Sequence, residues 1–141
     1  MITQRRIIIS VLLAACAVAL VYGASIGRPA DKPVVYTDPA VKTLSPQPGD
    51  VALRQTQIVA TLASAYTLAQ ETAPGMLING QGIPQDQITV NPSLNQYSYT
   101  PGPGKEVSSL PPGRNCVKIM VKRAADPSDT GHGFSWCFES Q

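Results

Sequence analysis

The side chains of this chain that could do chemistry are few: one histidine, His132, and three cysteines, Cys16, Cys116 and Cys137. His132 lies between two glycines in a turn-rich segment, whereas a catalytic imidazole needs a partner that positions it on each side. A zinc site needs three or four ligands at suitable spacing, which one histidine and a cysteine pair do not supply. The sequence therefore predicts a protein that is not an enzyme and that uses no metal or other cofactor.

Two further patterns resemble ligand sites, but each lacks a required feature. Residues 102–106 carry glycines and a lysine, yet they lack the spacing of a phosphate-binding loop, and Pro103 removes a backbone donor. Asp126 and Asp129 flank a turn, where carboxylates commonly accept hydrogen bonds from nearby backbone N–H groups. We therefore expect both aspartates to stabilise that turn, and a weak calcium site is the alternative.

Cys116 and Cys137 lie in two short apolar runs, residues 115–121 and 134–138, separated by the turn formers of residues 126–131. If the runs pair as antiparallel strands with Cys116 opposite Cys137, strand alternation places the large apolar side chains on one face. A shift of one residue would mix the two faces. The sequence therefore predicts a hairpin closed by a disulfide, which indicates an oxidising compartment. The apolar face would consist of Val117, Ile119, Val121, Phe134, Trp136 and Phe138.

The segment from residue 49 to residue 141 predicts an all-β domain. It contains about seven short apolar or alternating runs, with turn signals at intervals of roughly 8–12 residues. Residues 63–73 are the one stretch of this segment where a helix would also fit. Asn79-Gly80 indicates a tight hairpin turn followed by a return strand. The runs before the final hairpin are residues 51–53, 57–62, 66–68, 76–78, 83–90 and 96–100.

Tyr97 and Tyr99 are two residues apart in the 96–100 run, so they share one face of the predicted strand. Tyrosine combines a large contact area with a polar tip, which suits a binding surface. The two rings are therefore candidates for binding a partner, either a protein or a glycan. The alternative is that both are half-buried in the sheet.

The N-terminal segment predicts a membrane anchor. Residues 1–6 carry two arginines, and residues 7–26 then run without a charge for about 30 Å as a helix, enough to cross a bilayer. The basic flank predicts a cytoplasmic N-terminus and places everything after Arg28 outside the plasma membrane. Two alternatives stay open: a cleaved secretory signal, and lipidation at Cys16, since residues 13–16 resemble the bacterial lipobox. All three interpretations deliver the rest of the chain to the same side of the membrane.

The predicted helix and the segment after it suggest how the protein is held. Ala15, Ala19 and Gly23 recur every four positions and would form a stripe of small residues against which another helix can pack closely. Residues 27–48 contain five prolines and predict an extended stalk. The expected organisation is therefore a cytoplasmic N-terminus over residues 1–6, a transmembrane helix over 7–26, a proline-rich stalk over 27–48 and a β domain over 49–141.

Six runs between Ser45 and Gln141 follow one another along the chain, at residues 46–51, 58–62, 77–80, 97–101, 110–119 and 134–138. Their order resembles the bacterial immunoglobulin-like or fibronectin-III-like domain. The resemblance implies an immunoglobulin-like β-sandwich of about seven strands. Cys116 and Cys137 depart from the antibody pattern, because they fall on adjacent terminal strands and not on two facing sheets. As a whole, the layout also resembles small single-helix membrane proteins of actinobacteria.

These features together predict a non-enzymatic, membrane-anchored protein that binds or scaffolds a protein partner at the outer side of the cell envelope. The alternative is an accessory single-helix subunit of a larger membrane complex, such as an actinobacterial respiratory assembly. The net charge is only +2, and the excess positive charge lies at the N-terminus, which argues against a nucleic-acid partner. No residue pattern points to a small-molecule substrate.

Overall fold

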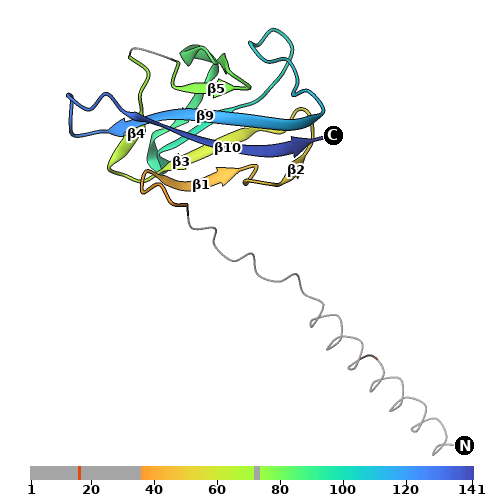
Figure 1. Cartoon of the computed structure of the whole chain (residues 1–141), viewed down its shortest axis with the longest axis horizontal. Coiled ribbons are helices and arrows are strands. Elements are labelled where there is room, and N and C mark those ends of the chain that lie inside the picture. The colour runs from red at the N-terminus through yellow and green to blue at the C-terminus, as the bar shows by residue number, and fades with distance from the viewer. Residues whose placement is uncertain (1–15, 17–35, 72–73) are drawn as a thin grey trace, which may run out of the picture. The chain divides into compact units, whose positions relative to one another are not determined.

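The computed structural model describes Cys16, residues 36–71 and residues 74–141 (Figure 1). The chain divides into two compact units, Met1–Val34 and Val35–Gln141. In the first unit only Cys16 is described, as an exposed helical residue with a free thiol.

The predicted anchor lies almost wholly outside the described residues. Within the described part of the chain, no helix is long and apolar enough to cross a membrane. The 7–26 helix, its Ala15, Ala19 and Gly23 stripe, and the stalk up to residue 35 therefore stay predictions.

The second unit is mostly β, as predicted, and its strands form two sheets. The first sheet has the order β1-β3-β8-β7, with all neighbours antiparallel. Its strands are β1 (Val41–Ser45), β3 (Ile58–Leu62), β8 (Gln96–Tyr99) and β7 (Thr89–Asn91). Two short 3₁₀ helices, η1 (Gln85–Gln87) and η2 (Pro92–Leu94), flank β7 in sequence.

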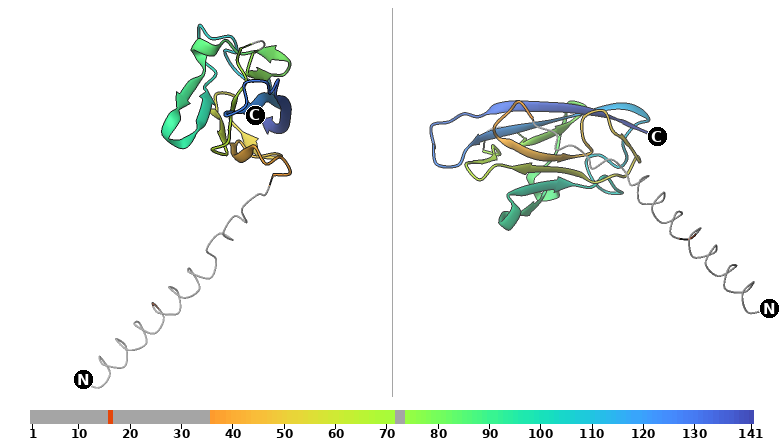
Figure 2. Two further views of the ribbon diagram at one scale, coloured as in Figure 1. Left: turned by 90° about the vertical axis from the view of Figure 1, so that its left-hand side faces the viewer. Right: turned by 90° about the horizontal axis from the view of Figure 1, so that it is seen from below.

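The second sheet has the order β2-β10-β9-β5-β6, and β4 also pairs with β9. Only the β2–β10 pair is parallel. The longest strands are β9 (Gly113–Arg123) and β10 (His132–Ser140), whose turn extends beyond the other strands at one end of the domain (Figure 2, right). The short strands are β2 (Val51–Ala52), β4 (Tyr66–Leu68), β5 (Met76–Ile78) and β6 (Gln81–Gly82).

One hydrophobic core joins the two sheets, and strand alternation explains which side chains enter it. In β3, the inward residues Ile58, Ala60 and Leu62 are at most 2% exposed, whereas the residues between them are half-buried on the other face. In β9 the inward apolar residues are fully buried in the same way. Each fully buried branched side chain contributes roughly 1.5–3 kcal/mol relative to an exposed one, so the inward faces of these two central strands contribute substantially to stability.

The β9–β10 hairpin has the predicted register. Cys137 lies opposite Cys116, Trp136 opposite Val117 and Ser135 opposite Lys118. The predicted disulfide joins Cys116 to Cys137, with an S–S distance of 2.05 Å and a Cα–Cα distance of 4.0 Å. The apolar face is confirmed as well, since its members are buried, apart from the half-buried Phe134. The disulfide therefore lies on the outer face of this sheet, away from the core.

One polar side chain, Asn115, lies on the core face of β9 and is fully buried. Its Oδ1 accepts a hydrogen bond of 2.8 Å from Asn79 Nδ2. Its Nδ2 lies 2.9 Å from the carbonyls of Pro111 and Gly113 and from Ser140 Oγ. An unpaired buried amide costs free energy, so loss of any of these contacts would be unfavourable. Through them, Asn115 holds the β5–β6 turn and the end of β10 next to β9. No local sequence pattern indicates this role of Asn115.

The β domain begins earlier than predicted, because β1 occupies residues that were expected to belong to the stalk. Val41 and Leu44 are buried, and β1 pairs with β3. A register shift between Val41 and Thr43 marks a β-bulge, which separates the two inward residues by three positions and not by two. Because of the bulge, strict alternation of buried and exposed residues does not identify β1 as a strand.

The 66–68 run, for which the pattern left open a strand or a helix, forms strand β4. One other local prediction is corrected. Asn79 and Gly80 do form the predicted tight turn, with φ of 51° and 83°, but its return strand is only β6. Strand β7, expected to pair back onto β5, belongs to the other sheet and pairs with β8.

The disulfide should contribute measurably to stability because it closes a loop with a sequence separation of 21. Replacing both cysteines, as Cys116→Ser with Cys137→Ser, is expected to lower the free energy of unfolding by about 3 kcal/mol. Urea unfolding followed by Trp136 fluorescence measures the change, and Cys16→Ser serves as the control. Equal midpoints for the double variant and the wild type would contradict a stabilising role.

Candidate functional site

A groove of about 910 Å³ opens at the end of the domain where β3 runs into β4. Its walls come from β1, the β3–β4 connection, η2 with the residues around it, and the start of β8. The β9–β10 turn lies at the same end, because β4 pairs with the last residues of β9 and Ala124 lines the groove. Segments far apart in sequence therefore build one concave surface.

One wall of the groove is a row of neutral polar side chains across the first sheet. Thr43 of β1 lies opposite Thr61 of β3, which lies opposite Gln96 of β8. Thr61 and Gln96 point away from the core, because the strand residues beside them are buried, and Thr43 is exposed next to the buried Leu44. Gln96 Nε2 donates a hydrogen bond of 3.4 Å to Thr61 Oγ1, so the row is partly ordered by its own contacts.

Asn95 fixes the floor of the groove. It adopts a left-handed conformation, with φ 49° and ψ 48°, which asparagine tolerates better than most residues. Its Nδ2 donates to the carbonyls of Ala63, at 3.0 Å, and Tyr66, at 2.8 Å. Its own carbonyl accepts a 3.0 Å bond from the Leu62 N–H. Sequence reasoning missed Asn95, because its partners lie about 30 residues earlier and its only local signal is an asparagine after a proline turn.

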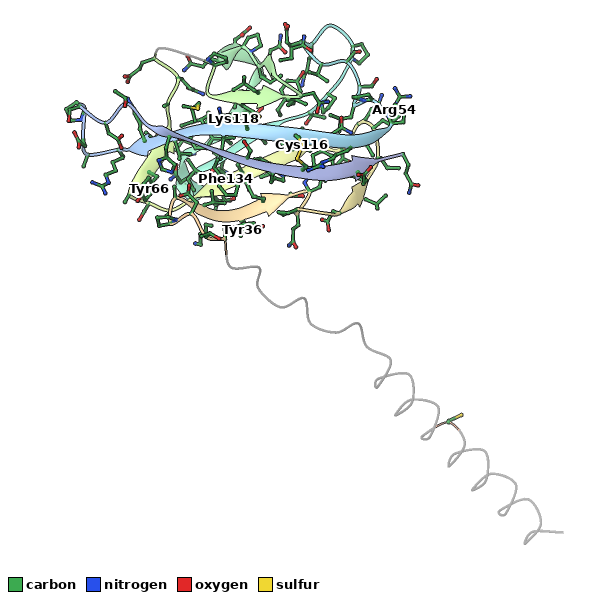
Figure 3. All side chains as sticks on the ribbon, viewed as in Figure 1. Tyr36, Arg54, Tyr66, Cys116, Lys118 and Phe134 are labelled. Atoms are coloured by element: carbon green, nitrogen blue, oxygen red, sulfur yellow. A yellow bond between two sulfur atoms is a disulfide. The ribbon has the colours of Figure 1, made fainter. Side chains whose placement is uncertain are left out.

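Tyr66 is the only aromatic residue among the described residues that line the groove. Its ring is half-buried and packs partly against the hydrophobic core. It also lines two adjoining hollows of about 300 and 380 Å³. Figure 3 shows Tyr66 at the end of the domain where the β9–β10 turn lies. Three concave surfaces therefore meet at this one side chain.

The hollow of about 380 Å³ next to Tyr66 is lined by Asp126 and Asp129, which act as the turn residues predicted from sequence. Asp126 Oδ1 accepts bonds of 2.6 Å from Ser128 Oγ and 2.9 Å from its N–H. Asp129 accepts bonds from the N–H groups of Arg123, at 2.8 Å, and Gly131, at 2.9 Å. These hydrogen bonds hold the pKa of each carboxyl below its ordinary value. Both carboxylates are thus already used by the turn.

His132 has a specific partner, although it lies between two glycines in a turn-rich segment. Its Nε2 lies 2.7 Å from Asp38 Oδ2, while Asp38 Oδ1 accepts a 2.9 Å bond from the Ala40 N–H. Close by in sequence, the rings of Tyr36 and Phe134 meet edge to face, with centroids 6.2 Å apart. Partial burial raises the pKa of Tyr36. These contacts hold the segment before β1 against β10, 94 residues further along, a separation that no local pattern reveals.

The prediction that Tyr97 and Tyr99 form a partner-binding surface is wrong. They share one face of β8 as expected, but that face is the core, and the residues are only 7% and 1% exposed. Tyr97 Oη makes a 2.9 Å hydrogen bond with Thr67 Oγ1. Tyr99 Oη donates to the Val107 carbonyl at 3.0 Å and accepts from its N–H at 2.8 Å. Both phenol groups therefore make hydrogen bonds within the domain, and those of Tyr99 hold the loop between β8 and β9.

The role of Asn95 can be tested with two substitutions that tolerate the same backbone conformation. Asn95→Gly removes the side-chain bonds and is expected to lower the free energy of unfolding by about 1–3 kcal/mol. Asn95→Asp is expected to be more destabilising, because it turns a carboxylate toward the Ala63 and Tyr66 carbonyls. Urea unfolding at neutral pH measures both. An Asn95→Asp variant as stable as the wild type would show that the amide does not hold the floor.

The β9–β10 turn should contribute a pH-dependent part of stability through Asp129. Because its pKa is lower in the folded protein than the ordinary value of 3.8, its contribution is present above that value and is lost as the pH falls through the folded pKa. We therefore expect wild type to be more stable than Asp129→Asn at about pH 6, with the difference shrinking toward about pH 2. Thermal melts across this range measure it, and a pH-independent difference would contradict the assignment.

The described lining of the groove offers neutral hydroxyl and amide groups, one aromatic ring, apolar side chains that include the exposed Leu94, and a single charged side chain, Lys42. Such a surface provides contact area and hydrogen bonds, which suit the recognition of a ligand. Comparisons of the chain with protein-family models, with curated proteins and with solved structures find no match.

Proposed function

We propose that Val35–Gln141 is an immunoglobulin-like β-sandwich that acts as a binding module at the outer side of the cell envelope. The strand order supports the architecture. β1, β3, β8 and β7 take the places of strands A, B, E and D of that fold, and β10, β9 and β5 take the places of G, F and C. Strand β2 continues the first strand onto the second sheet, where it pairs with β10.

The domain departs from antibody domains in its covalent link. Cys116 and Cys137 join β9 to β10, in the places of strands F and G, within one sheet. The single tryptophan, Trp136, lies in β10 and donates a 3.0 Å hydrogen bond to the Pro46 carbonyl. In antibody domains the disulfide crosses between the sheets and the tryptophan lies in strand C. The likeness therefore rests on topology and not on these marker residues.

The groove around Tyr66 is the observation that carries the binding function. Its described lining contains hydroxyls, amides and an aromatic ring, with no carboxylate or imidazole that could act as a general base. Its volume of about 910 Å³ lies in the range of known ligand sites. These properties favour recognition over catalysis.

The sequence supports the placement at the membrane. The uncharged run of residues 7–26 is long enough to anchor the domain, and its basic flank favours a cytoplasmic N-terminus. A disulfide between Cys116 and Cys137 fits an oxidising compartment. Lipidation at Cys16 would place the domain on the same side.

A second candidate is an accessory subunit of a membrane complex, in which the helix and not the domain makes the essential contact. The spacing of Ala15, Ala19 and Gly23 favours it, because a stripe of small residues lets helices pack closely. The domain would then serve as a cap on the outer side of the complex.

Affinity purification of the tagged full chain from native membranes, followed by mass spectrometry, separates the two functions. One variant replaces residues 1–26 with an unrelated single-pass anchor, and another, Gln96→Arg, places a charge in the groove wall. Partners lost in Gln96→Arg but kept after the anchor exchange would support the binding module. Partners lost only after the anchor exchange would overturn it in favour of the accessory subunit.

The control for this experiment is Thr89→Ala, on the same sheet but outside the groove. It should keep every partner that the wild type retains. If Thr89→Ala loses the same proteins as Gln96→Arg, the effect does not come from the groove, and the binding module is contradicted.

A further inference from the structure

We propose that the groove binds a neutral oligosaccharide chain, with the Tyr66 ring as the platform on which a sugar stacks. This inference rests on the proposed function, since it names the ligand class of the same site. The neutral row Thr43, Thr61 and Gln96 would supply hydrogen bonds to the sugar hydroxyls.

The charge of the groove selects an uncharged ligand. Lys42 is the only charged residue in its described lining, and it sits at the bulge of β1 with its side chain exposed. Binding of a phosphate or another strong anion commonly uses several cations or a bidentate arginine. A cationic ligand would need carboxylates; the described lining of the groove has none, and those of the adjoining hollows, Asp126 and Asp129, already accept hydrogen bonds from their own turn. The remaining lining of hydroxyl groups, amides and apolar side chains such as Leu94 matches a neutral ligand that presents both hydroxyl groups and C–H faces.

The spacing of the polar row suits a repeating ligand. Thr43, Thr61 and Gln96 are direct neighbours on three adjacent strands. Adjacent strands lie about 4.7–4.9 Å apart, which is close to the length of one sugar ring in an extended chain. Successive sugar units could therefore meet successive side chains of the row, each able to donate and to accept a hydrogen bond.

Tyr66 is held in place before any ligand arrives. Its carbonyl accepts a bond from Asn95 Nδ2, its N–H donates to the Ala63 carbonyl at 2.9 Å, and its ring rests partly on the core. A fixed tyrosine supplies a large, flat contact at low entropic cost. The C–H face of a sugar ring can stack on such a surface while the phenol hydroxyl remains available for a hydrogen bond.

The concave surface extends beyond one sugar unit. Ser64, Tyr66 and Ala124 line both the main groove and the adjoining hollow of about 300 Å³. Tyr66 also lines the third hollow, of about 380 Å³. A ligand that lies along the groove can therefore continue past Tyr66, which favours a chain over a single small molecule.

A peptide strand cannot be added over the face of the groove wall. The wall lies over β1, β3 and β8, and because β3 and β8 already have a paired strand on each side, only the outer edge of β1 is open to strand addition. Strand addition needs an edge with free backbone N–H and C=O groups. Recognition over this face must come from side chains, as it does for a sugar.

The probes for the test are cellohexaose, maltohexaose, mannohexaose and chitohexaose, measured with the full chain by saturation-transfer NMR and titration calorimetry. A detergent without a sugar head group is required, because an alkyl glycoside would compete for the groove. The wild type is expected to bind at least one of these probes. Failure to bind any of them overturns the inference.

Substitutions at Tyr66 separate stacking from the hydroxyl group. Tyr66→Phe keeps the ring and is expected to bind within about threefold of the wild type, whereas Tyr66→Leu should bind about tenfold more weakly. Gln96→Ala should weaken binding about threefold or more, and the control Thr89→Ala should not change it. Thermal melts verify that each variant is folded, and Gln96→Ala reports on the groove without touching the core.

The outcomes distinguish this inference from the proposed function. If no probe binds but the affinity purification still returns partners that Gln96→Arg loses, the ligand class is wrong and the binding module stands. If a probe binds equally well to folded Tyr66→Leu and Gln96→Ala, the groove is not its site and the inference is overturned.

Discussion

The pairing of β9 with β10 is the constraint on which the rest of the domain depends. β9 is the central strand of its sheet: it pairs with β10 on one side and with β4 and β5 on the other, while β10 also carries β2. One register places Val117, Ile119 and Val121 in the core and brings Cys116 opposite Cys137. A shift by one residue would turn the apolar set to the solvent and separate the cysteines. The hydrophobic effect and the covalent link therefore select the same pairing.

This agreement explains why the hairpin could be predicted from sequence and other contacts could not. The alternation of apolar and polar residues and the spacing of the cysteines are local patterns that can be recognised in a single sequence. β1 broke the alternation with a bulge between Val41 and Thr43, so its inward residues did not look like a strand. The pairing of His132 with Asp38 joins positions 94 residues apart, and nothing near either residue indicates the other. The floor of the groove, held by Asn95, depends on a similarly distant set of carbonyls.

The tyrosines show a related limit of pattern reasoning. Alternation correctly places Tyr97 and Tyr99 on one face of β8, but it does not say which face meets the core. Ser98 between them is itself only 8% exposed, so its polarity does not indicate which face of β8 meets the solvent. Tyr66, in a segment whose pattern fitted either a strand or a helix, is the aromatic residue that lines the groove. A candidate surface residue is thus identified by what packs around it and not by its type alone.

The positions of the disulfide and the groove would separate stability from the recognition that we propose for this domain. Cys116 and Cys137 lie on the outer face of the second sheet, whereas Thr43, Thr61 and Gln96 lie on the outer face of the first. The shared core lies between them, so a change at the disulfide reaches the groove only through the packing of both sheets. Reduction of the disulfide should then weaken ligand binding only to the extent that it unfolds the domain. A loss of binding in a reduced but folded protein would require a direct link between the two faces, and no contact in the described part of the chain provides one.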